Sequence, residues 1–188
     1  MTDKTGTDKM GSDKKGERSR THTWTLPTAF ADGTEPPIDV LHRMIAGEVP
    51  PPPISETMGF YLAEVEDGRA VFTSRPEEFH YNPFGSVHGG YYAAILDSAL
   101  GIAILSTLPA GAGFTTLEFK VNLVRPMYAD TGDVRAIGQI IHRGSRQATA
   151  EARLEGVDGK LYAHANTTCM IFESWGQRDP RNGGPQSA

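Results

Sequence analysis

The sequence has a single cysteine, Cys169, among its 188 residues, so the chain cannot form an internal disulfide. The fold therefore needs no oxidising compartment. No apolar stretch approaches the roughly 20 residues that span a bilayer, and no apolar run follows the charged N-terminus as it would in a signal peptide. The formal net charge of −5 leaves no basic excess to attract nucleic acid. We therefore expect a cytoplasmic protein with neither nucleic acid nor a membrane as partner.

The chain length suits one folded domain with short tails. In residues 1–22 an Asp-Lys pair recurs every five residues among Gly, Thr and Ser. Such a segment buries too little apolar surface to offset the entropy of ordering. Residues 176–188 are similarly rich in Gly, Pro and Arg. We predict disordered tails at 1–22 and 176–188 around one domain at 37–175, with a functional N-terminal tail as the alternative.

The first half of the domain contains short elements that are separated by prolines and turn residues. Apolar residues at helical spacing behind a proline predict a helix over 37–47. The proline run at 50–53 predicts a stiff extended connector. Two strands are then predicted at 58–65 and 70–79, joined by a hairpin turn at 66–68.

The second half begins with a helix that is apolar nearly all round, from Gly90 to about Thr107. A helix without a polar face is buried on most sides. Four strands are predicted after it, at 114–124, 133–142, 148–156 and 161–172. Antiparallel strands around one buried helix indicate an α+β fold in which a curved sheet wraps the helix.

The glycine pair Gly89-Gly90 opens this helix. The first turn of a helix presents unpaired N–H groups and partial positive charge, and glycine lets a ligand approach the backbone closely. Such a turn can polarise a carbonyl group and stabilise the oxyanion that develops from it. Alone, the pair favours the simpler interpretation, a tight strand-to-helix turn.

Asp97 favours a functional role for this segment over a simple turn. Its neighbours along the helix, Ser98 excepted, are apolar, and an unpaired buried carboxylate is costly. A solvent-facing or ion-paired aspartate is the ordinary reading, but on this helix a functional carboxylate is favoured. His88 is interpreted as a structural or orienting residue and not as a base. Asn82, which precedes a proline, is either a turn former or a group that positions water or substrate.

The spacing of these residues resembles the active-site segment of hotdog-fold acyl-CoA thioesterases of the phenylacetate-degradation (PaaI-like) type, in the 4-hydroxybenzoyl-CoA thioesterase superfamily. Asn82 stands six residues before His88, Gly89 and Gly90 follow at once, and Asp97 stands nine residues after the histidine. The resemblance extends over about residues 59–172 and implies the hotdog fold. It implies Asp97 as general base or nucleophile, the Gly89 N–H on the thioester oxygen, and Asn82 orienting water. Related enzymes carry Glu at the place of this Asp.

The resemblance also implies a helper hydroxyl at Thr115, with Thr116 as the adjacent candidate, and sites built between two subunits. Homodimers, often paired into tetramers, follow from it. It places the phosphates of coenzyme A at the basic turn after residue 142, although arginines also decorate ordinary solvated turns. The residues predicted to bind substrate are Gly90, Thr116, Asn122, Arg143, Gly144, Ser145 and Arg146.

The predicted function is hydrolysis of an acyl-CoA to free acid and CoA, without a cofactor, since coenzyme A is part of the substrate. No metal is required, because the histidines lack paired ligand spacing. General-base and nucleophilic roles for Asp97 stay open. A non-catalytic acyl-CoA-binding hotdog protein, as sensor or accessory subunit, is the alternative. Core packing is the better reading for each aromatic residue near the expected acyl pocket: Phe79, Phe84, Tyr91, Tyr92 and Phe114.

Overall fold

The computed structural model describes residues 16–30 and 33–173 of the chain. Its elements, in chain order, are α1 (Pro37–Ile45), α2 (Pro53–Met58), β1 (Phe60–Glu66), β2 (Arg69–Ser74), the short 3-10 helix η1 (Glu78–His80), α3 (Gly89–Leu105), β3 (Gly113–Leu123), β4 (Val134–Arg143), β5 (Gln147–Gly156) and β6 (Leu161–Phe172). In the described part of the chain, no helix has the length and apolar character needed to cross a membrane.

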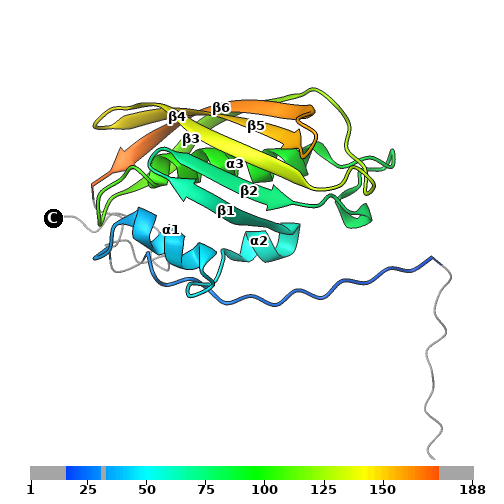
Figure 1. Cartoon of the computed structure of the whole chain (residues 1–188), viewed down its shortest axis with the longest axis horizontal. Coiled ribbons are helices and arrows are strands. Elements are labelled where there is room, and N and C mark those ends of the chain that lie inside the picture. The colour runs from blue at the N-terminus through cyan, green and yellow to red at the C-terminus, as the bar shows by residue number, and fades with distance from the viewer. Residues whose placement is uncertain (1–15, 31–32, 174–188) are drawn as a thin grey trace, which may run out of the picture.

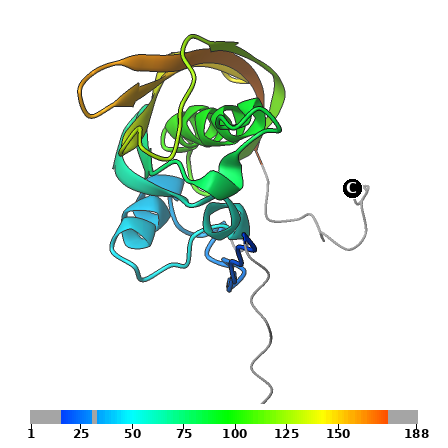
Figure 2. The same ribbon diagram turned by 90° about the vertical axis from the view of Figure 1, so that its right-hand side faces the viewer.

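The six strands form one antiparallel sheet in the order β1-β2-β4-β5-β6-β3. The sheet curves over α3, which lies against its concave face (Figures 1 and 2). The predicted α+β hotdog fold is confirmed. Because β1 and β3 are the two edges, α3 has one sheet edge on each side.

Helix α3 forms the centre of the core because most of its apolar side chains are completely buried. Strand β4 crosses directly beneath it. A Cβ at Gly138 would collide with the carbonyl of Ala99, so glycine at this position lets strand and helix pack at close range. The curved sheet and α3 thereby fix the direction of every side chain on the helix, including Asp97.

Two predicted boundaries are wrong in the first half of the domain. Pro53 does not continue the extended connector but starts α2, where its missing N–H costs no hydrogen bond. The strand predicted over 70–79 ends at Ser74. Pro76 cannot donate to a strand ladder, and the chain leaves the sheet to form η1.

Residues 16–30 run along α2 without helix or strand and include part of the segment predicted to be disordered (Figure 1). Arg20 donates to the carbonyls of Thr57 and Glu56 at 3.1 and 3.2 Å. Its guanidinium lies 3.8 Å from the ring centroid of Phe79. These contacts satisfy carbonyls at the end of α2, which a helix leaves unpaired. The domain boundaries stay a prediction, and 1–15 and 176–188 lie outside the described residues.

Candidate active site

His88 caps the N-terminus of α3. Its extended backbone turns the chain into the helix, and its Nδ1 accepts a hydrogen bond of 2.8 Å from the N–H of Gly90. The neutral ring therefore carries its proton on Nε2. His88 thus makes a structural contact in the single chain, and its orienting role stays a prediction. It also occupies the N–H of Gly90, so Gly89 presents the N–H that can face a ligand.

Asn82 organises the loop that leads to this cap. Its Oδ1 accepts from the N–H groups of Phe84 and Ser86 at 2.9 and 3.3 Å, and its Nδ2 donates to Ser86 Oγ at 3.0 Å. In the single chain, the Asn82 side chain therefore forms a turn, which is one of the two roles considered for it from the sequence. One N–H of its amide is left for a further acceptor.

Asp97 lies in the middle of α3 and is half-buried. Its Oδ1 accepts a hydrogen bond of 3.3 Å from Thr116 Oγ1. Burial raises the pKa of Asp97 above its usual 3.8, and the Thr116 hydrogen bond opposes this by stabilising the carboxylate. A carboxylate with a raised pKa in a partly covered site is suited to accept a proton.

The hydroxyl that contacts Asp97 is that of Thr116, whereas the prediction put Thr115 first. The register of β3 on β6 pairs Thr116 with the buried Cys169, and Thr115 with the exposed Met170. Successive strand residues point to opposite faces, so Thr116 faces α3 and Thr115 faces away from it. The sequence shows that residues of this strand alternate between two faces. It does not show which of the two faces contacts α3.

Cys169 is the residue near Asp97 that the sequence did not indicate. Its Sγ lies 3.9 Å from Thr116 Oγ1 and 3.8 Å from Thr167 Oγ1. Burial raises the pKa of the Cys169 thiol, so the group is a neutral thiol and a poor nucleophile. It packs behind Thr116 and limits where that hydroxyl can point.

His80, another residue not predicted, holds the Asn82 loop to the core. Its Nδ1 accepts from the Glu77 N–H at 2.9 Å, and Nε2 donates to the Met58 carbonyl at 2.8 Å. The ring lies 4.2 Å from that of Tyr91. Burial lowers the pKa of His80, which keeps the ring neutral. Nothing in the local sequence pattern distinguishes this histidine from an exposed one.

The predicted residues fall into two groups within one chain. Asn82, His88 and Gly89 lie at the start of α3, while Asp97 and Thr116 lie together farther along. At 1.5 Å per residue, Gly89 and Asp97 are separated by about 12 Å along the helix axis. A single thioester carbonyl cannot contact both of them in the same chain.

The basic turn lies close to the second group. It borders an open depression of about 540 Å³ lined by His142, Gly144, Ser145, Arg146, Gln147 and Met170. Gln147, Met170 and Thr115 are paired across three neighbouring strands, which puts the turn about 10 Å from Thr115. Neither Arg143 nor Arg146 has an acidic partner within the described ranges.

Asn122, by contrast, pairs with His164 near the other end of β3. About 20 Å of strand separates it from Thr116, so Asn122 and the basic turn cannot contact the same phosphate in one chain. Among residues 16–30 and 33–173, no group of three or more His, Cys, Asp or Glu side chains is arranged to hold a metal ion.

Known proteins resemble this chain in sequence and in fold. Residues 84–163 match the model of the thioesterase superfamily. A candidate esterase from Saccharolobus solfataricus is 33% identical over 113 residues, which are 60% of this chain and 79% of that protein. A 1,4-dihydroxy-2-naphthoyl-CoA hydrolase from Listeria monocytogenes is 26% identical over 118 residues, 63% of this chain and 94% of the relative.

A solved structure from Ralstonia eutropha JMP134, named as a candidate thioesterase related to phenylacetic acid degradation, superposes with a TM-score of 0.63. It is 32% identical, and the match covers 69% of this chain and 98% of that protein. The PaaI protein of E. coli has the same fold at a TM-score of 0.63 and 19% identity, over 76% of this chain and 96% of its own length. The chain therefore belongs to the thioesterase superfamily and is a PaaI-like hotdog protein of the thioester hydrolase class.

Proposed function

We propose that this protein hydrolyses an acyl-CoA thioester to the free acid and coenzyme A. One observation carries the proposal: Asp97, a half-buried carboxylate on an otherwise apolar helix, is held by Thr116 and has a raised pKa. A structural aspartate at this position would be expected to have a cation beside it. None of the ion pairs among the described residues involves Asp97.

Two routes are consistent with this geometry. In the first, the Asp97 carboxylate takes a proton from a water molecule, whose oxygen attacks the thioester carbon. In the second, the carboxylate attacks the carbon itself, and water then hydrolyses the mixed anhydride. In both routes the C–S bond breaks and CoA leaves as a thiolate that takes up a proton. The developing oxyanion is stabilised by the Gly89 N–H, and the free amide N–H of Asn82 orients the water.

The site is completed by two copies of the chain. The separation of about 12 Å between Gly89 and Asp97 supports this, because both must reach one carbonyl. Leu123, at the end of β3, contacts Gly89, since a Cβ added there would lie 3.2 Å from Leu123 Cδ1. Antiparallel self-pairing of β3 about Phe119 sets Leu123 of one copy opposite Thr115 of the other. Gly89 from one copy then approaches Asp97 of the second.

The surface of β3 supports such pairing. This edge strand has free ladder groups on its outer side and exposes Leu117, Phe119 and Leu123. Phe84 in the Asn82 loop is 92% exposed. Large apolar side chains gathered at a sheet edge indicate a protein interface. We propose a homodimer through β3, which can pair further into a tetramer.

Coenzyme A would lie along the depression beside the basic turn. Arg143 and Arg146 have free guanidinium groups that suit phosphate, because the planar fork binds bidentately. The distance of about 10 Å from the turn to Thr115 is short enough for an extended pantetheine arm to span. Ser145 and the N–H of the flexible turn supply further donors.

The experiment is thiol release from a panel of acyl-CoAs, followed with a thiol reagent, for the unaltered protein and for Asp97→Asn. Asn keeps the shape of the side chain but can neither accept the proton nor attack. We expect turnover to fall at least about a hundredfold while CoA binding survives. Retained turnover would exclude Asp97 from the chemistry. If the unaltered protein releases no thiol from any acyl-CoA but still binds CoA, a non-catalytic acyl-CoA-binding protein would be favoured.

A further inference from the structure

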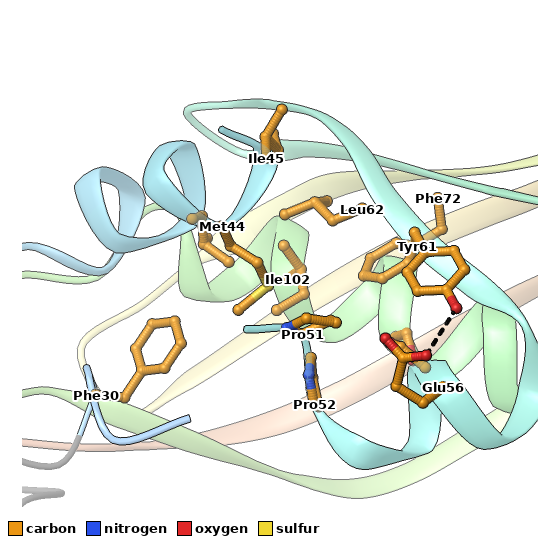
Figure 3. A pocket seen from close by; sticks show the side chains of 13 residues that line it. Phe30, Met44, Ile45, Pro51, Pro52, Glu56, Tyr61, Leu62, Phe72 and Ile102 are labelled. Atoms are coloured by element: carbon orange, nitrogen blue, oxygen red, sulfur yellow. Dashed lines mark hydrogen bonds between the residues drawn. The ribbon is translucent and has the colours of Figure 1, made fainter. Parts of the chain in front are cut away.

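A partly open chamber lies on the side of α3 away from β3, between that helix and the elements α1, α2 and β1 (Figure 3). Its volume is about 440 Å³, within the range of about 300–1,000 Å³ typical of small-molecule pockets. The walls are mainly apolar and come from segments far apart in the sequence. The apolar lining includes Phe30, Leu41, Met44, Leu62, Phe72 and Ile102.

The chamber contains almost no charge. Its lining has no Lys, Arg or His, and Glu56 is its one carboxylate. Glu56 Oε2 accepts a hydrogen bond of 3.1 Å from Tyr61 Oη, and the pair lies at the end of the chamber opposite Phe30 (Figure 3). Burial and the neighbouring Glu56 raise the pKa of Tyr61, so the phenol stays neutral. An incoming ligand would meet apolar surface and one carboxylate. The nearby cation Arg20 acts on Tyr61 and binds the carbonyls of Glu56 and Thr57, but it is not part of the lining.

The chamber reaches α3 at Ser98, the residue that follows Asp97. Consecutive helix residues are about 100° apart around the axis, so Asp97 faces β3 while Ser98 faces the chamber. Ala94, Asp97, Ser98 and Ile102 form a partly exposed stripe along the middle of α3. Ala93 and Leu105 are also partly exposed, and most of the remaining helix residues are buried. The small side chains of Ala94 and Ser98 leave room beside the carboxylate for a chain that enters the chamber.

The walls away from α3 are held in place without a ligand. Arg20 fixes the end of α2 through the carbonyls of Thr57 and Glu56, and His22 Nδ1 lies 3.1 Å from the same Glu56 oxygen. Phe30, which closes the far end, belongs to the same N-terminal segment. A pocket formed in advance loses less entropy when its ligand binds.

On the basis of the proposed function, we propose that this chamber receives the acyl group and restricts the substrate to uncharged, apolar acyl chains longer than acetyl. The thioester lies at Asp97, and the chain passes Ser98 to contact Met44, Leu62 and Ile102. An acyl group with a terminal carboxylate is rejected, because its charge would enter an apolar chamber beside Glu56. The aromatic residues near the expected acyl pocket, for which core packing was the better reading, do not line this chamber. Tyr91 and Tyr92 are in the core as expected, but Phe79 and Phe84 are exposed.

The test compares three substrates that differ in one property at a time: acetyl-CoA, hexanoyl-CoA and adipoyl-CoA, which has the six-carbon chain with a terminal carboxylate. We expect kcat/KM for hexanoyl-CoA to exceed that for each of the other two by at least about tenfold. Equal rates for hexanoyl-CoA and adipoyl-CoA would overturn the inference.

Two substitutions then reduce the space from opposite walls, Met44→Trp on α1 and Ile102→Phe on α3. Each should lower the hexanoyl-to-acetyl ratio of kcat/KM by about tenfold or more. Val157→Trp, at a residue 78% exposed beyond the end of β5, is the matched control and should keep the ratio. Since a larger side chain can prevent folding, Ile102→Ala provides a second variant. It should shift the preference toward chains longer than hexanoyl.

The charge is tested by Glu56→Gln, which can still accept a hydrogen bond from Tyr61. The adipoyl-to-hexanoyl ratio should rise at least about threefold. If the unaltered protein hydrolyses acyl-CoAs but the wall and charge variants leave every ratio unchanged, the chamber is not the acyl site and the proposed function stands. If the unaltered protein hydrolyses no acyl-CoA, the proposed function fails and the inference fails with it.

Discussion

The hydroxyl of Thr116 donates to Asp97 Oδ1 across 3.3 Å, linking the sheet edge to the centre of the buried helix. This hydrogen bond lowers the pKa of Asp97, whereas burial raises it. Burial favours the neutral acid, and the hydroxyl favours the carboxylate that either chemical route requires. The balance between these two effects determines the pH at which the proposed reaction begins.

Asp97→Asn should make the protein more stable at neutral pH as well as inactive. The folded-state pKa of Asp97 lies above the ordinary 3.8, so the folded state binds more protons than the unfolded state between those two values. This contribution to stability is present below 3.8 and is lost as the pH rises through the folded-state pKa. Thermal melting should therefore show a higher Tm for the variant at pH 7. The difference should shrink toward pH 4, and a lower Tm at pH 7 would contradict the burial of this charge.

Thr116→Val and Thr115→Val form a matched pair on adjacent residues. Loss of the Thr116 hydroxyl removes a donor to the carboxylate, so the acid limb of the pH profile of kcat/KM should move to higher pH. Turnover near neutral pH should fall by about tenfold or more. Thr115→Val should leave the position of this limb unchanged, because its side chain lies on the other face of β3. A shift for Thr115 alone would restore the original prediction of the helper hydroxyl.

Gly89→Ala tests the backbone N–H at the start of α3. An added Cβ would lie 3.2 Å from Leu123 Cδ1, a side-chain tip that can move, so we expect the fold to persist. The methyl group would keep a thioester oxygen from approaching the N–H, and kcat/KM should fall by at least about tenfold. Circular dichroism and melting separate this effect from unfolding. Full activity would show that the carbonyl does not approach this group.

His80 should make the stability of the protein sensitive to mild acid. Burial holds its pKa below the ordinary 6.5, so the unfolded state binds more protons than the folded state between those two values. Stability should decline as the pH falls from 6.5 toward the folded-state pKa. His80→Gln should lower Tm at pH 7.5 through lost hydrogen bonds, and its Tm should change less between pH 7.5 and 5.5 than that of the unaltered protein. A corresponding change at the exposed His164 serves as control.

Phe119→Glu should separate the proposed dimer. Antiparallel self-pairing about this residue would bring two carboxylates together in the interface, which costs free energy at an edge strand. Light scattering after size exclusion should report monomers, and activity should fall with the dimer fraction because Gly89 and Asp97 come from different copies. Val157→Glu should change neither. An active monomer would refute the shared site, and an intact dimer would refute pairing through β3.

The sequence alone predicted the features that depend on residues close together in the chain. The helix start, predicted at Gly90 and found at Gly89, the position of Asp97 on that helix and the hairpin turns all depend on residues that are close together in the chain. The hydroxyl beside Asp97 is that of Thr116 and not that of Thr115, because this choice depends on how β3 pairs with β6, where the register shifts between Thr116 and Glu118. His80 was missed because its role comes from the Met58 carbonyl, 22 residues away. The chamber beside Ser98 was missed for the same reason, since five separate helices and strands contribute to its walls.

The burial of Cys169 has a practical consequence. It is the single cysteine of the chain and has no exposed surface, and its raised pKa keeps it protonated at neutral pH. Aromatic disulfides and maleimides react with thiolates that they can reach, so the folded protein should consume no reagent of its own. Colour that develops in a hydrolysis assay then reports released coenzyme A alone, and a slow rise in blanks without substrate would measure global unfolding.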